Sequence, residues 1–118
     1  MRFVELGGFT EKKAGLHIET IELATLALAR IKNSTNGFDT LQYRLSNVFY
    51  WASQVVAGTR NLIAIKIEGT DPKTRGELRV IFCDLWVRPW LDAEESVILN
   101  SWQQVLANDC KIFFHLLL

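Results

Sequence analysis

The side chains that could carry catalysis or hold a metal are few and lie far apart in this sequence. His17 stands at the start of a predicted helix and His115 inside an apolar run, and neither accompanies a serine or cysteine nucleophile motif. Cys83 and Cys110 lack the CxxC spacing of redox and zinc motifs, and neither histidine is spaced to complete a metal site with them. No glycine-rich phosphate loop is present. We therefore expect no enzyme, with no catalytic residue, no metal and no cofactor.

Two pairs of reactive or charged residues have plain structural explanations. On spacing alone, Cys83 and Cys110 are either one disulfide or two buried thiols. Glu94 and Glu95 are most simply a solvated charge at the start of a helix, where negative charge is favourable. Neither pair points to a reaction.

Charge and length limit the remaining functions. The 118 residues contain 13 Lys and Arg against 13 Asp and Glu, so no net field attracts nucleic acid or an anionic membrane. The most apolar stretch, residues 16–31, carries Glu19, Glu22 and Arg30, which a membrane-spanning helix would reject. We expect a single domain over residues 1–118, with neither a nucleic-acid partner nor a membrane partner.

The elements that must position any site begin with an arm and a helix. Residues 1–14 show no long periodic pattern and contain Gly7 and Gly8, which predicts an extended arm. Residues 16–32 predict one amphipathic helix, because apolar side chains recur at helical spacing and the charges fall outside that stripe. The stripe consists of Ile21, Ala24, Leu28 and Ile31. Residues 33–37 then end the helix with turn formers.

Strand patterns fill most of the remaining chain. Alternation of apolar and polar residues predicts a long strand over residues 41–51 and further strands over 62–68 and 78–87. Residues 111–118 form a short apolar run that fits a closing edge strand, and residues 91–109 suggest a short helix through Val97, Leu99, Trp102, Val105 and Leu106. One helix followed by consecutive strands predicts an α+β fold, with the helix packed on a twisted antiparallel sheet of four to five strands.

Three short segments each have a common structural explanation on their own, but their order and spacing along the chain are more specific. They are Leu6, Gly7 and Gly8; then Gln54, Val55, Val56, Ala57 and Gly58; and finally Pro89 and Trp90. A terminal glycine pair is usually a flexible tail, a Gln-to-Gly run an ordinary hairpin, and a tryptophan after proline a core residue. In this order and at this spacing the segments resemble the cystatin family, and the resemblance extends over nearly the whole chain.

The resemblance implies a function and a site. Cystatins are reversible, tight-binding inhibitors of papain-like cysteine proteases, such as cathepsins, and block the active-site cleft with an arm and two hairpin loops. The three segments would therefore be the protease-binding residues of a cystatin-like fold, with Leu6 and Val4 in substrate-side pockets. The alternative is a cystatin-fold binding or structural module that does not inhibit.

Similarity to the secreted type 2 cystatins carries further implications. It pairs Cys83 with Cys110 as a single disulfide, as in arthropod-type members, which would stabilise the fold by roughly 3 kcal/mol. It also implies secretion, although the first residues contain no apolar signal segment and a cytosolic chain stays open. Some secreted members bind legumain through an asparagine after the helix, which makes Asn36 a candidate contact, with Gly37 replacing the family's aspartate. We expect a monomer, with a domain-swapped dimer as the alternative.

Overall fold

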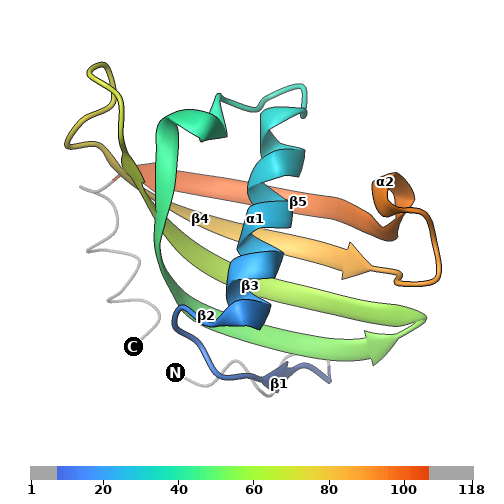
Figure 1. Ribbon diagram of the computed structural model, residues 1–118. Coiled ribbons are helices and arrows are strands. Elements are labelled where there is room, and N and C mark those ends of the chain that lie inside the picture. Colours follow the sequence, from blue (N-terminus) through green and yellow to red (C-terminus); the bar gives the residue numbers. More distant parts are fainter. Residues whose placement is uncertain (1–7, 107–118) are drawn as a thin grey trace.

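The computed structural model describes residues 8–106, and one long helix lies across a five-stranded antiparallel sheet in it (Figure 1). The chain forms β1 (Thr10–Glu11), α1 (Ile18–Lys32), the 3-10 turn η1 (Thr40–Gln42), β2 (Tyr43–Val56), β3 (Gly58–Gly69), β4 (Leu78–Val87), α2 (Ala93–Ser96) and β5 (Val97–Leu106). The strands pair in chain order, so the sheet is a simple meander. The predicted α+β class is confirmed, with five strands.

Helix α1 begins and ends close to its predicted bounds, but two of the four residues of its buried stripe differ: Leu28 is only partly buried. The backbone N–H of His17 donates to Thr20 Oγ1 at 3.1 Å, which satisfies a free donor at the first turn. The residues that face the sheet are Thr20, Ala24, Ala27 and Ile31, all fully buried. Ile21, which we placed in this stripe, is 43% exposed, so that prediction was wrong. Small Ala24 and Ala27 let the helix approach the sheet closely.

Strand β2 does not keep one alternation along its length, because two bulges interrupt it. Its pairing with β3 shifts between Leu45 and Asn47 and again between Val48 and Tyr50. Each bulge adds a residue and bends the strand, which changes the face of the residues that follow. Val48 therefore enters the core under α1, whereas Phe49 meets Phe82 edge-on with ring centroids 6.2 Å apart.

The segment after β4 corrects a second prediction. Instead of a short helix built from Val97, Leu99 and Trp102, the chain makes a four-residue helix at Ala93–Ser96 and then the long strand β5. Val97, Leu99 and Trp102 pack on the core from this strand. The helix prediction was wrong because apolar residues two and three positions apart fit a strand with a bulge as well as a helix. The closing strand expected over residues 111–118 lies outside the described residues.

The core is a row of isoleucines beneath α1. Ile63, Ile65 and Ile67 of β3 are at most 2% exposed, and Ile81, Cys83 and Leu85 continue the same layer on β4. Ile31 closes the layer from the helix. The Arg30 guanidinium fixes the helix to β5, because its Nε donates to the Val97 carbonyl at 3.0 Å. These contacts determine where the strand ends lie.

Ile31→Ala should lower the free energy of unfolding by about 2–5 kcal/mol, because it removes a fully buried side chain and leaves a cavity. Ile18→Ala in the same helix is the matched control: its side chain is 80% exposed and the change should stay within about 0.5 kcal/mol. Urea denaturation followed by circular dichroism measures both. Similar losses for the two variants would contradict this packing.

Candidate functional site

The second and third predicted segments lie at one end of the sheet, with the arm beside them. The β2–β3 hairpin and the β4–β5 connection project on the same side of the molecule (Figure 1). Gly8 adopts φ +81°, and a Cβ there would lie 3.1 Å from Gln54 Nε2. We call Gly8, Gln54–Gly58 and Pro89–Trp90 the loop edge. Leu6 and Gly7 lie outside the described residues.

The first hairpin is held close to β4 by the absence of a side chain. Val56 pairs with Gly58, so Ala57 alone forms the tip. Gly58 has φ +87°, and a Cβ at this position would overlap the Val87 carbonyl oxygen. The Trp86 indole Nε1–H donates to the Ala57 carbonyl at 2.7 Å and fastens the tip to β4. The sequence needs glycine here both for the turn and for the close approach.

The second loop is a turn that presents Trp90 to solvent. The Leu91 N–H donates to the Arg88 carbonyl at 3.1 Å, which puts Pro89 at the second position of the turn, where its fixed φ fits. Arg88 supports the turn: its guanidinium lies 4.4 Å over the Trp86 ring and donates to the Glu95 carbonyl. Trp90 is 60% exposed, so it is not the core tryptophan of the ordinary explanation.

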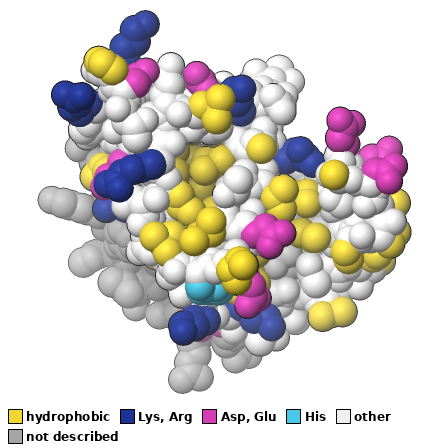
Figure 2. Space-filling view, in the orientation of Figure 1, with side chains coloured by type: hydrophobic (Ala, Val, Ile, Leu, Met, Phe, Trp, Pro, Cys, Tyr) yellow, Lys and Arg dark blue, Asp and Glu magenta, His cyan; other side chains and the backbone are white. Residues whose placement is uncertain are grey.

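Exposed apolar side chains gather on the loop edge. Val55 is 85% exposed and Val56 45% exposed, and both lie on β2 a few residues beyond the buried Trp51 and Ala52. Trp90 is likewise exposed on the second loop, so both loops present apolar side chains on ordered backbone (Figure 2 shows further exposed hydrophobic side chains on the helix face). Apolar groups placed this way mark an interaction surface when they are contiguous.

A charged cluster behind the loop edge was not anticipated from the sequence. Arg60 and Asp84 form a bidentate ion pair across β3 and β4, and Asn100 Nδ2 donates to Asp84 at 3.3 Å. The hydrogen bonds to Asp84 raise the pKa of Arg60. The Phe9 ring, 7% exposed, lies 5.5 Å from the Arg60 guanidinium carbon. Phe9 therefore anchors the arm beside Gly8. The sequence feature that could have predicted this anchor is the aromatic residue directly after the glycine pair.

The remaining candidate residues take structural places. His17 lies at the start of α1, as expected, with Nε2 2.8 Å from the Lys13 carbonyl oxygen. Glu94 and Glu95 occupy the first turn of α2, which confirms their assignment to a helix start. Asn36 is exposed in the turn after α1, at the other end of that helix from the arm. Within the described part of the chain, no group of three His, Cys, Asp or Glu side chains is placed to hold a metal ion.

Cys83 lies in the core and is bonded to no other cysteine among residues 8–106. It is 4% exposed and stands opposite Ile63 on β3 and Trp102 on β5. Burial raises the pKa of its thiol to about 12. Cys110, the partner that the resemblance assigned to it, lies outside the described residues, and the disulfide stays a prediction.

Comparison with known proteins supports the fold. No protein-family model and no curated protein matches the sequence. Among solved structures, "Crystal structure of Al-CPI" is similar with a TM-score of 0.57 and 24% sequence identity, covering 84% of this chain and 100% of that chain. The two chains therefore share a fold. In the described region, none of the helices has the length and apolar character needed to cross a membrane.

Gly58→Ala should destabilise the protein by about 2 kcal/mol or more, because it adds overlap with the Val87 carbonyl to an unfavourable positive φ. Gly76→Ala separates the two effects: Gly76 has φ +84°, but a Cβ added there would meet no atom within 4 Å, so only about 1 kcal/mol should be lost. Thermal unfolding of both variants measures the difference. Equal losses would mean that the approach to β4 is not tight.

Cys83 should resist thiol reagents in the folded protein, because burial holds its pKa near 12 and leaves almost no thiolate at about pH 8. After denaturation without reductant, a free Cys83 should label at once, whereas a Cys83–Cys110 disulfide should label only after reduction. Maleimide labelling followed by peptide mass spectrometry distinguishes these cases. Rapid labelling of Cys83 in the native protein would contradict the buried thiol.

Proposed function

We propose that this protein is a reversible, tight-binding inhibitor of papain-like cysteine proteases that uses a cystatin-like fold. The observation that carries the proposal is the loop edge: Val55 and Val56 at the end of β2 and Trp90 in the β4–β5 connection are exposed on backbone that is tied to the sheet. Gly8 places the arm next to the first of these loops. Such an edge can enter a cleft as a wedge.

The proposed mechanism is occlusion of the cleft. Residues 55–58 carry only valine, alanine and glycine side chains, so the hairpin can approach an apolar cleft wall without burying charge. The hairpin is already ordered by its ladder with β3 and by the Trp86 hydrogen bond, so binding costs less conformational entropy than ordering a free peptide. Trp90 adds a large and stiff apolar side chain, a type common among binding hot spots.

The arm supplies the third contact of this proposal. Phe9 is buried and β1 pairs with β2 through Thr10 and Ser53, which fixes where the arm leaves the domain. From this point, Leu6 and Gly7 would extend across the cleft into substrate-side pockets, as the cystatin resemblance implies. Because these pockets differ most between related proteases, the arm would contribute to selectivity.

The similar solved structure supports the same class of function. The letters CPI in the name Al-CPI agree with the abbreviation for cysteine protease inhibitor, and that protein shares the fold of this chain. The three segments inferred from the sequence add independent support, since the two loops and Gly8 meet at one edge rather than scatter over the surface. We assign papain-like cysteine proteases as the partner on these two grounds together.

Titration of active papain with the full chain and a fluorogenic peptide tests the proposal directly. The hydrolysis rate should fall with added protein until the enzyme is occupied, and activity should return on dilution, because the inhibitor forms no covalent bond. Undiminished activity at micromolar protein would favour the alternative, a cystatin-fold module without inhibitory function.

Trp90→Ala should weaken inhibition by about 2 kcal/mol, or roughly thirtyfold in the inhibition constant, if Trp90 is a hot spot. Leu41→Ala is the matched control, because Leu41 is 75% exposed on η1, at the opposite end of β2 from the hairpin. It should inhibit like the parent. Both variants should keep the parent's melting temperature, since neither side chain is core. Equal inhibition by Trp90→Ala and the parent would remove Trp90 from the contact.

A further inference from the structure

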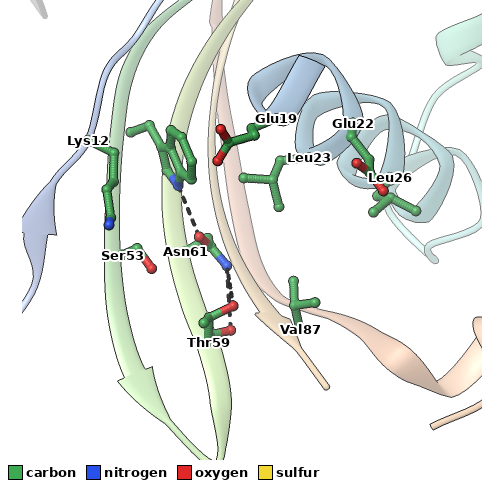
Figure 3. Close-up of a pocket in the computed structure, with 10 residues that line it drawn as sticks. Lys12, Glu19, Glu22, Leu23, Leu26, Ser53, Thr59, Asn61 and Val87 are labelled. Atoms are coloured by element: carbon green, nitrogen blue, oxygen red, sulfur yellow. Dashed lines mark hydrogen bonds between the residues drawn. The ribbon is translucent and has the colours of Figure 1, made fainter. Parts of the chain in front are cut away.

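A groove opens beside the loop edge, between the N-terminal half of α1 and the sheet (Figure 3). Its volume is about 310 Å³, within the range of specific binding sites. Leu23 and Leu26 form the helix wall, and Trp51 and Val87 form the apolar part of the sheet wall. The groove is thus predominantly apolar.

The polar groups on the floor of the groove are already bonded to one another. Trp51 Nε1 donates to Asn61 Oδ1 at 2.9 Å, and Asn61 Nδ2 donates to Thr59 Oγ1 at 3.1 Å. Figure 3 shows this chain of hydrogen bonds along the sheet wall. An occupant therefore need not supply hydrogen bonds to the floor, and its selection rests on apolar contact and on charge.

The charge of the groove is net negative. Glu19 and Glu22 lie on the helix side, three residues apart and thus on one face of α1, and Lys12 lies on the sheet side (Figure 3). Both glutamates are exposed, and neither makes an ion pair among the described residues. Two free carboxylates at the rim of an apolar groove match a cation on a long aliphatic stem.

The groove is continuous with the loop edge. Thr59 lines the groove and pairs with Val55 on one side and with Val87 on the other. Val55 and Thr59 share a face of the sheet with Asn61 and Trp51, because side chains alternate along paired strands. A protein seated on the loop edge would therefore extend over the mouth of the groove.

We propose that the groove receives a lysine or arginine side chain from the rim of the bound protease. The stem of that side chain covers Leu23, Leu26 and Trp51, and its charged head meets Glu19 and Glu22. This inference rests on the proposed function and adds a second contact to it, outside the cleft. Because the pair stays near solvent, it acts mainly on the rate of association and on the choice of partner.

The double variant Glu19→Gln/Glu22→Gln tests the groove against papain. Its association rate should fall by about threefold or more at low salt, and the difference from the parent should shrink at high salt as the charges are screened. Glu19→Lys/Glu22→Lys should slow association further, because it places like charges together. Stopped-flow fluorescence measures the rates, and circular dichroism verifies the helix, since Glu19 lies in the first turn of α1.

Glu94→Gln/Glu95→Gln is the matched control, because it removes the same two charges from another exposed helix start near the loop edge. It should slow association less than the groove variant does. If both variants change the rate equally, or if neither does, the groove receives no basic side chain and the inference is wrong while the inhibitor proposal stands. If the parent itself does not inhibit papain, the inhibitor proposal and the groove inference are both contradicted.

Discussion

The packing of α1 on the buried isoleucine row of β3 is the contact on which the positions of the other elements depend. Ile63, Ile65 and Ile67 lie under α1 and are all but inaccessible to solvent. A slip of β3 by one residue would turn all three to the opposite face, so burial fixes the register of β3 with both neighbours. Since the sheet is a meander, fixed registers also bring the β2–β3 and β4–β5 loops to the same end.

The loop edge differs from the core because its apolar side chains are exposed to solvent. Three apolar side chains there are exposed, so they do not contribute the stabilising free energy that burial would give, while hydrogen bonds hold the backbone beneath them. The holding contacts come from elsewhere: Trp86 on the hairpin tip, Arg88 on the second turn, and Arg60 with Asp84 behind Phe9. A rigid apolar edge is costly for an isolated domain and useful for one that binds a cleft.

The periodicity of the sequence was sufficient for the fold class, because helical and strand spacing depend on local geometry, whereas the grouping of the loop segments was implied by the cystatin resemblance. Helical spacing predicted the bounds of α1 to within two residues. Periodicity was insufficient where tertiary contacts decide. The bulges in β2 interrupt its alternation and depend on its pairing with β3, and residues 97–106 were predicted as a helix because their apolar spacing also fits a bulged strand. The groove shows the same limit: Glu19 and Glu22 belong to no motif, and only the crossing of α1 over the sheet places them at one cavity with Lys12 and Trp51.

One face of β3 connects these regions in a graded way. From Ile67 to Ile63 the side chains on this face are covered by α1. Asn61 is still buried and accepts a hydrogen bond from the Trp51 indole at the floor of the groove. Thr59 then lines the groove, and Gly58 forms part of the hairpin turn. Because the helix covers only part of the strand, the same alternation that builds the core continues beyond it into the groove and the hairpin. The stabilising core is concentrated at one end of β3 and the proposed binding surface lies at the other, so on the proposed function substitutions near Thr59 alter binding while the isoleucine row keeps the domain folded.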